Sequence, residues 1–575
     1  MNMNRRDFLK VVGYASLTPA TANVFAENTH TKKPNVVIIV TDDQYEFGFL
    51  SGKATTPNID KIVKEGIYLS RAYTTAACTP TRYNILTGKY ATSSKSRQML
   101  EWVSKEGQYN IQWNTSLYYE DEPMPMPKYF QKNGYFTGGV GKTHNNVRGN
   151  RQQNQQMAKA KANLAAITDY TSPKFKADMN LYQQALNDSL KTVGFDYTAS
   201  IVAGNLDNGP SKFCNVHNQE WMTKGAIDFL TEVSKQDKPF FLYFATTLEH
   251  GPHEKRRSLD EDPRKCSGGY LDKPITGYQP SRESVMERAA KITKDGKFGS
   301  VIWLDDGIGA IMDKLKAMGA ADNTIVIYLS DHTTSGKASC YDGGAKTPVV
   351  VRWTKSFKSG ECHALTHTID IFPTLIDLCG LPEPKGLQID GLDMADVLYG
   401  KQNEARKALL VEWGSSRAVV TSDNYKYIAL RHPESVINRE DYEKSVREFR
   451  KTVAEQKLDM TKIITDPTYH PEVVWPFDQS GRYTSMRPGG TYKQPARNYY
   501  KTIHDSDQLY DLNKDPGEQN NLAYKPEYKT KLAEMKKYLT DLMRDRPGSF
   551  AEFKTIGNQE KKYWEDNYKK YHTND

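Results

Sequence analysis

The chain has 575 residues, of which 38% are hydrophobic and 26% charged, a composition that excludes an intrinsically disordered protein. Because a single hydrophobic core stops growing at roughly 250–300 residues, this length predicts a large domain with a smaller companion. The 78 Lys and Arg residues are nearly balanced by 70 Asp and Glu residues, which excludes the basic footprint of a nucleic-acid-binding protein. The net charge of +8 mildly favours an anionic substrate, with an ordinary solvated surface as the alternative.

The first 26 residues have the features of an export signal. Paired arginines in Asn4 to Lys10 (NRRDFLK) precede a weakly apolar stretch that ends with small residues at Ala26. This pattern resembles a twin-arginine signal, so we expect residues 1–26 to be removed and the mature protein to begin near Glu27, in the bacterial periplasm or outside the cell. A basic amphipathic N-terminus is the alternative. No later segment reaches the ~20 apolar residues of a membrane span.

The first predicted strand, Asn35 to Thr41 (NVVIIVT), is a continuous β-branched apolar run that ends at Asp42-Asp43. Such a run without polar alternation is typical of a strand buried on both faces of a mainly parallel sheet. A helix is predicted over Met126 to Lys132 and ends at Gly134, and the chain returns as a strand over Tyr135 to Val140. This part of the chain therefore has the alternation of an α/β fold.

Two polar stretches interrupt this alternation. Residues 145–191 are rich in Gln, Asn, Ala and Lys, and residues 253–297 are charged and loop-like. Between them, Pro239 to Thr246 (PFFLYFAT) is a second buried strand that leads to His250. We expect both stretches to be surface insertions near one rim of the sheet, where they could shape the access of a substrate.

The next segment has the clearest helix and a third buried strand. One apolar helical stripe is formed by Val301, Leu304, Ile308, Ile311, Leu315 and Met318. The strand Thr324 to Ser330 (TIVIYLS) then leads to Asp331-His332. Because ligands of open α/β sheets bind at the carboxyl ends of the strands, we expect the polar residues after all three strands in one crevice. The prediction is a large α/β/α sandwich with a mainly parallel central sheet over residues 27–410.

The pattern changes to shorter pieces in residues 411–575. Ala418 to Thr421 and Tyr425 to Leu430 are strand-like, and a final amphipathic helix lies near Leu532 to Met543. We therefore predict a smaller C-terminal α+β domain. Its segment Leu509 to Ala523 (LYDLNKDPGEQNNLA) carries no obvious chemistry, so we expect an architectural role for it.

The six cysteines lie at positions 78, 214, 266, 340, 362 and 379, without CxxC pairs or metal-finger spacing. A disulfide framework is not expected, and a single bridge stays open without an assigned pair. Cys78 stands out because Cys78-Thr79-Pro80-Thr81-Arg82 has the form CxPxR and is followed by Leu86-Thr87-Gly88. Taken alone, Cys78 has the small buried thiol as its alternative, since that is the commonest state of a free cysteine.

Polar residues elsewhere in the chain make the CxPxR motif more specific. Asp42-Asp43 precedes it, and the residues that follow it are Gly141-Lys142-Thr143-His144, His250, Asp331-His332, Gly336-Lys337 and Tyr341-Asp342-Gly343-Gly344. In this order the chain resembles the formylglycine-dependent sulfatases of the alkaline phosphatase superfamily, from Asn35 into the C-terminal domain. The resemblance implies an alkaline-phosphatase-like fold and the hydrolysis of sulfate esters.

The resemblance implies one Ca²⁺ per active site, with Asp42, Asp43, Cys78, Asp331 and His332 as its ligands. Carboxylate oxygens are the hard donors that Ca²⁺ prefers. The family residue after Asp331 is often Asn, so His332 departs from the pattern, and it either ligates through nitrogen or orients the sulfate group. The alternative for Asp42-Asp43 is a helix cap after a strand.

The resemblance also implies a modified nucleophile. A formylglycine-generating enzyme or an equivalent maturase would oxidise Cys78 to 3-oxoalanine (formylglycine), whose hydrate carries two hydroxyl groups on one carbon. Arg82 lies four residues later, one helical turn if the motif opens a helix, and would hold that hydrate.

The remaining roles fall to lysines and histidines. Lys142 and Lys337 would bind sulfate oxygens as point charges. His144 would orient or deprotonate the second hydroxyl of the hydrate, and His250 would be the general acid for the leaving alcohol. His253, on the same loop as His250, would contact the sugar next to the sulfate.

An exported enzyme with large rim insertions suits an external sulfated carbohydrate. We expect the substrate to be a polysaccharide of algal galactan or ulvan type, or a glycosaminoglycan. Two alternatives stay open: a phosphodiesterase or phosphonate monoester hydrolase of the same superfamily, and a catalytically silent protein that binds sulfated glycans. The complete set of Lys, His and Asp positions argues against the silent protein.

Overall fold

The computed structural model describes residues 32–94, 122, 124–144, 151–252, 258–334, 336–432, 438–459, 500, 502–544, 546 and 550–553. The predicted export segment 1–26 and His253 lie outside these ranges. The described residues from Pro34 onward belong to one compact unit. None of the helices in these ranges combines the length and the apolarity that a membrane span requires.

The central sheet has eight strands and is mainly parallel. Its strand order is β11 (Gly360–Cys362), β2 (Ile67–Leu69), β10 (Val349–Arg352), β9 (Thr324–Ser330), β1 (Asn35–Asp42), β6 (Phe240–Glu249), β4 (Phe136–Lys142) and β5 (Tyr197–Val202). Only β10 runs against its neighbours, β9 and β2. The three buried strands predicted from apolar runs are β1, β6 and β9, which lie side by side, so the prediction of a mainly parallel sheet is confirmed.

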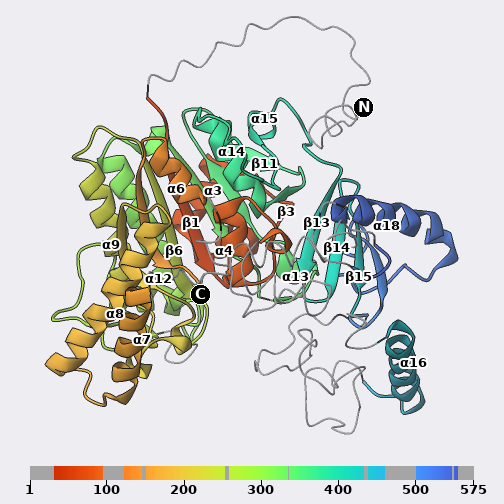
Figure 1. Cartoon of the computed structure of the whole chain (residues 1–575), viewed down its shortest axis with the longest axis horizontal. Helices are drawn as coiled ribbons and strands as arrows, with labels where there is room; N and C mark the ends of the chain where they lie inside the picture. Colours follow the sequence, from red (N-terminus) through yellow and green to blue (C-terminus); the bar gives the residue numbers. More distant parts are fainter. Residues whose placement is uncertain are drawn as a thin grey trace, which may run out of the picture. The chain divides into compact units, whose positions relative to one another are not determined.

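Helices cover both faces of this sheet. Val36, Ile38 and Val40 of β1 pack into one core, whereas Val37 and Ile39 pack into the other. The first core includes residues of α4 (Cys78–Thr87), α6 (Met126–Lys132), α8 (Pro173–Thr192) and α14 (Ile371–Leu378). The second includes residues of α3 (Pro57–Glu65), α9 (Gln219–Val233), α11 (Arg282–Ile292) and α12 (Gly299–Ala317). The predicted α/β/α sandwich is therefore confirmed (Figure 1).

The expectation of a surface insertion over residues 145–191 is wrong for much of that stretch. It contains α7 (Arg151–Ala166) and α8, which pack against each other. The residues that α8 buries in the core of the sandwich are Phe175, Met179, Tyr182, Leu186 and Leu190. They recur at helical spacing, a stripe that the polar composition of the stretch concealed. In the other stretch, α11 and the short hairpin of β7 (Lys265–Cys266) and β8 (Gly269–Tyr270) are ordered elements.

A second, antiparallel sheet follows in the chain. Its strands in order are β13 (Ala408–Trp413), β14 (Ser416–Thr421), β15 (Tyr425–Leu430) and β16 (Asp507–Asp511). One face packs against α18 (Lys529–Met543) through Met535 and Leu539. The other face packs on residues next to Cys78, among them Tyr73 and Ala77. The smaller α+β part is confirmed, while the domain limit after residue 410 stays a prediction.

The described ranges also contain the 17-residue helix α16 (Arg439–Glu455). Shorter elements are α2 (Gly48–Ser51), β3 (Ala72–Tyr73), α13 (Asp342–Ala345), β12 (Thr366–His367) and α15 (Ala395–Leu398), besides several turns of 3-10 helix.

Candidate active site

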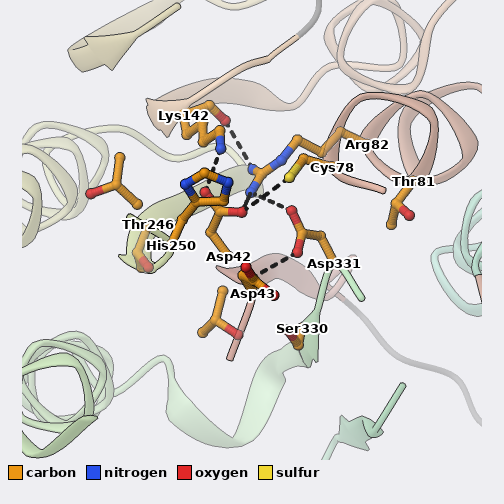
Figure 2. A network of polar contacts seen from close by, with 12 residues as sticks. Asp42, Asp43, Cys78, Thr81, Arg82, Lys142, Thr246, His250, Ser330 and Asp331 are labelled. Carbon is orange, nitrogen blue, oxygen red and sulfur yellow. Dashed lines mark hydrogen bonds and ion pairs between the residues drawn. The ribbon is translucent and has the colours of Figure 1, made fainter. Parts of the chain in front are cut away.

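The polar residues that follow the buried strands meet at one edge of the central sheet. Asp42 is the last residue of β1, Lys142 is the last residue of β4, and Asp331 follows β9 directly. His250 follows β6, and Cys78 is the first residue of α4. Figure 2 shows these side chains gathered around one point, which is the arrangement that the strand ends predicted.

Four of the predicted metal ligands form a buried cluster. One ligand atom from each of Asp42, Cys78, Asp331 and His332 lies within 4.8 Å of the others. Cys78 Sγ lies 3.3 Å from Asp42 Oδ1 and 3.4 Å from His332 Nε2. His332 Nε2 in turn lies 3.5 Å from Asp331 Oδ1. Two carboxylates, an imidazole and the Cys78 position thus share a space of the size that a single cation occupies.

Asp43, the fifth predicted ligand, lies at the edge of this cluster in a left-handed backbone conformation with a φ of 56°. Its backbone N–H donates to Asp331 Oδ1 at 3.0 Å. Its Oδ1 is buried, has no hydrogen-bond partner among the described residues, and lies 3.6 Å from His332 Nδ1. A buried carboxylate oxygen without a hydrogen bond is costly unless a cation balances it, so Asp43 fits a metal site.

Arg82 is fully buried and joins three parts of the site. Its Nη2 donates to Asp331 Oδ2 at 3.0 Å, and its Nη1 donates to the backbone oxygen of Lys142 at 3.1 Å. Arg82 also lies one turn after Cys78 on α4, as the motif spacing predicted. The guanidinium therefore ties the start of α4 to the ends of β9 and β4.

Both predicted lysines reach the carboxylates. Lys142 Nζ pairs with Asp42 and also donates to Asn205 Oδ1 at 2.7 Å, while Lys337 Nζ donates to Asp43 Oδ2 at 3.1 Å. Lys142 follows Gly141, whose φ is +93° and where a Cβ would lie 1.9 Å from the backbone oxygen of Ala245. Only glycine fits there, because a side chain would overlap the backbone of β6 and the positive φ is unfavourable for other residues.

Burial and nearby charges set the ionisation of these groups. Burial raises the pKa of Asp42, but Lys142 and other cations of the site hold it well below its ordinary value. Burial also raises the pKa of Asp43, but the positive charges nearby, chiefly Lys337, outweigh it and lower the pKa to about 2. Burial, followed by Asp42, raises the pKa of the Cys78 thiol well above its usual value. At neutral pH the carboxyls are therefore ionised and an unmodified Cys78 is protonated.

Two histidines complete the site. His144 has a φ of 47°, and its Nδ1 is buried without a hydrogen-bond partner among the described residues. His250 Nδ1 lies 3.2 Å from the backbone oxygen of Gly251, which can only accept, so Nδ1 carries the proton and Nε2 is left to titrate. Burial lowers the pKa of both imidazoles well below the ordinary value, with further lowering from Lys142 for His144 and from Lys337 for His250.

Two supporting residues were not predicted. Asn205, in the loop after β5, accepts a hydrogen bond from Lys142, and His217, before α9, contacts the His250 backbone oxygen through Nε2 at 2.9 Å. His217 Nδ1 lies 2.9 Å from Thr247 Oγ1. Because a carbonyl only accepts, the Nε2 of His217 is the donor. No motif marks either residue: a buried lysine needs an acceptor, but nothing in the sequence identifies Asn205 as that acceptor.

The sequence also matches known families and relatives. The profile of the family described as Sulfatase matches residues 34–381, well over half of the chain. A second profile, described as N-sulphoglucosamine sulphohydrolase, C-terminal, matches residues 330–466.

A sulfatase of Formosa agariphila is 25% identical over 459 residues, which cover 69% of this chain and 78% of the relative. An N-acetylgalactosamine-6-O-sulfatase of Bacteroides thetaiotaomicron is 26% identical over 486 residues, with 72% and 86% covered. An ulvan-active sulfatase of Formosa agariphila is 23% identical over 518 residues, with 87% and 78% covered.

Solved structures share the fold. The crystal structure of Ps i-CgsB in complex with k-i-k-neocarrahexaose has a TM-score of 0.53 at 18% identity and covers 93% of this chain and 98% of that one. A structure from work on the metabolism of multiple glycosaminoglycans by Bacteroides thetaiotaomicron has a TM-score of 0.53 at 19% identity, with 89% and 99% covered. The match of the family profile to residues 34–381 decides the family: this chain is an enzyme of the sulfatase family.

Proposed function

We propose that this enzyme hydrolyses sulfate esters on an extracellular polysaccharide of algal galactan or ulvan type, or on a glycosaminoglycan. The observation that carries the reaction is the place of Cys78, the first residue of α4, whose Sγ contacts both Asp42 and His332. The carbohydrate class is supported by relatives described as an ulvan-active sulfatase and an N-acetylgalactosamine-6-O-sulfatase, and by a structural neighbour in complex with neocarrahexaose.

Ca²⁺ is the metal that suits this donor set. Asp42, Asp43 and Asp331 offer buried carboxylate oxygens, and His332 and the modified Cys78 complete the proposed ligands. Hard oxygen donors favour Ca²⁺ over softer metals. When bound, Ca²⁺ supplies positive charge beside the nucleophile and the sulfate group.

The proposed nucleophile is formylglycine, made from Cys78 by a formylglycine-generating enzyme or an equivalent maturase. Its hydrate supplies two hydroxyl groups on one carbon, so that one attacks sulfur and the other loses its proton when sulfate is released. Arg82 supports this position because it fixes the first turn of α4 to Asp331 and to the Lys142 backbone. A rigid attachment of this kind keeps the nucleophile aligned with the sulfur atom.

The two lysines supply the positive charge that a sulfate group needs. Lys142 is held by Asp42 and Lys337 by the neighbouring Asp43, and the ammonium charge of both side chains suits the oxygens of a sulfate group. Charge that develops on those oxygens in the transition state is stabilised by donors that are already in place. The lysines therefore bind the substrate and also lower the barrier.

The two histidines are suited to opposite proton transfers. The neutral form of His144, favoured by burial and Lys142, accepts the proton of the second hydroxyl. An incoming sulfate adds negative charge next to His250 and raises its pKa, so that Nε2 gains the proton that the leaving alcohol needs. We propose this acid role for His250, and a contact between His253 and the adjacent sugar.

Two further proposals concern maturation and destination. Residues 1–26 direct export by a twin-arginine route, and the mature enzyme acts in the periplasm or outside the cell. Such a location would bring the enzyme to polysaccharides that do not enter the cytoplasm.

A parallel assay tests the proposed function. Enzyme matured in a bacterial host would be offered sulfated oligosaccharides of galactan, ulvan and glycosaminoglycan origin, with phosphate monoesters and diesters alongside. We expect sulfate release from at least one oligosaccharide at a higher kcat/KM than any phosphorus ester. A preference for the phosphate diesters would reject the sulfatase reaction, and tight binding of a sulfated oligosaccharide without turnover would indicate a silent glycan-binding protein.

A further inference from the structure

A buried ion cluster joins the C-terminal sheet to residues 336–345, which carry Lys337 and are called the Lys337 segment below. Lys426 of β15 donates from Nζ to Asp342 Oδ1 at 2.6 Å and lies 2.9 Å from Glu518 Oε1. Glu518 Oε2 accepts the backbone N–H of Asp342 at 2.7 Å, which closes the triangle. Lys426 is 0% exposed and Glu518 is 1% exposed. Removal of one member would leave a buried charge without its partner, which is strongly destabilising for the local structure.

Asp342 is linked to the backbone next to Lys337 through the two residues that follow it, Gly343 and Gly344. The backbone N–H of Gly336 donates to the oxygen of Gly343 at 2.6 Å, and the Thr333 hydroxyl donates to that oxygen at 2.8 Å. A Cβ at Gly344 would lie 1.9 Å from the Gly336 oxygen, so the two sides of this segment touch without space for a side chain. A shift of Asp342 would therefore be passed through Gly343 and Gly344 to Gly336, the neighbour of Lys337.

The residue before Asp342 is held by the same sheet. The Tyr341 hydroxyl donates to Gln508 Oε1 of β16 at 2.5 Å. The Tyr341 ring stacks on Tyr500 with centroids 3.6 Å apart. Both contacts come from the C-terminal part of the chain, and both are buried. The adjacent residues Tyr341 and Asp342 are thus both held by contacts with the C-terminal part of the chain.

We propose that Lys426 and Glu518 are positioning residues that hold Lys337 against Asp43 by way of Asp342. The segment Leu509 to Ala523, for which the sequence indicates no chemistry, then has a function through Glu518. It helps to place Lys337, which binds the sulfate group. The proposal rests on the proposed function only in taking Lys337 as a ligand of the sulfate group.

Two variants test this link in the full-length, matured protein: Glu518→Ala and Lys426→Met. We expect each to increase the rate of amide hydrogen exchange in residues 336–345. We also expect the KM for para-nitrophenyl sulfate and the inhibition constant of inorganic sulfate to rise together by about tenfold, because Lys337 already contacts the sulfate group in the ground state. A residue that only supports the fold would lower the amount of active enzyme and leave both constants unchanged.

The matched control is Asp507→Asn. Asp507 is a mostly buried carboxylate of the same sheet that pairs with Arg431 and Lys536, away from the Lys337 segment. This variant should lose stability without a change in either constant. A second control uses Lys337→Ala as background, where Glu518→Ala should no longer weaken sulfate binding, since residues that act through one another are not additive.

The outcomes separate this inference from the proposed function. A folded Glu518→Ala protein with unchanged exchange in residues 336–345, or with unchanged sulfate constants, would overturn the positioning role. So would an equal loss of sulfate binding in the Lys337→Ala background. Failure of the wild-type enzyme on every sulfate ester would reject the proposed function, while hydrogen exchange would still decide whether Glu518 and Lys426 hold the segment.

Discussion

Arg82 Nη2 and Asp331 Oδ2 form a fully buried ion pair at 3.0 Å between residues 249 positions apart in the chain. One residue comes from the helix that begins at Cys78 and the other from the end of the strand at the centre of the sheet. Because both groups are removed from water, each needs the other, and their separation fixes where the nucleophile lies relative to the carboxylates.

The first prediction concerns this pair. Arg82→Lys keeps the charge but loses the planar fork that reaches Asp331 and the Lys142 backbone together. We expect kcat/KM to fall by about a hundredfold or more, since small misplacements of reacting groups have effects of this size. Arg82→Ala, which leaves Asp331 without its buried partner, should also lose about 3–5 kcal/mol of unfolding free energy. Steady-state kinetics and urea unfolding measure the two effects, and wild-type kinetics in Arg82→Lys would contradict this account of Arg82.

The second prediction concerns Gly141. Gly141→Ala would place a Cβ 1.9 Å from the Ala245 oxygen in a backbone with a φ of +93°. The combined strain and overlap should lower the unfolding free energy by about 3 kcal/mol or more. Gly134→Ala is the matched control, because Gly134 has a φ of +89° and an added Cβ would meet no atom within 4 Å there, so this variant should lose only about 1–2 kcal/mol. Equal losses in the two variants would show that overlap with Ala245 is unimportant.

The third prediction concerns Asn205, which holds the Lys142 ammonium at 2.7 Å. Asn205→Ala removes one acceptor from a buried cation, and we expect kcat/KM for a sulfate ester to drop by about ten- to a hundredfold. Asn163→Ala is the control: it removes the hydrogen bond from Asn163 of α7 to Asp178 of α8 and should leave kcat/KM unchanged. If both variants behave alike, Asn205 has no role in placing Lys142.

The fourth prediction concerns the metal. Removal of divalent cations with a chelator should abolish turnover, and Ca²⁺ should restore it. At a hundredfold excess over Kd, Ca²⁺ should add about 2–3 kcal/mol of stability. Asp331→Asn, with one ligand charge fewer, should lose most of this calcium-dependent increase, whereas Asp507→Asn should keep it. Full activity after exhaustive chelation would exclude an essential metal.

Much of the fold could be predicted because its signals are local. The apolar runs at Asn35 and Thr324 can only be buried on both faces, and they became β1 and β9 with almost the expected limits. Polar residues dominate the composition of α8 and conceal its apolar stripe, although Phe175 and Met179 recur at helical spacing.

The candidate site was predictable only where residue types carry chemistry at a recognisable spacing. Cys78 and Arg82 are joined by a motif, and Asp42 and Asp331 follow buried strands. Asn205 acts through a contact between segments distant in sequence, and nothing near it in the chain indicates its partner.

The central claim is that Cys78 becomes formylglycine, and the mass of the peptide that contains it is the most direct measurement. Protein purified from its native host would be digested, and the peptide that spans Cys78 analysed by mass spectrometry, with the specific activity of the same preparation measured in parallel. The account predicts the mass of the aldehyde or its hydrate in a fraction of molecules that tracks the activity. A fully intact thiol in a fully active preparation would contradict it.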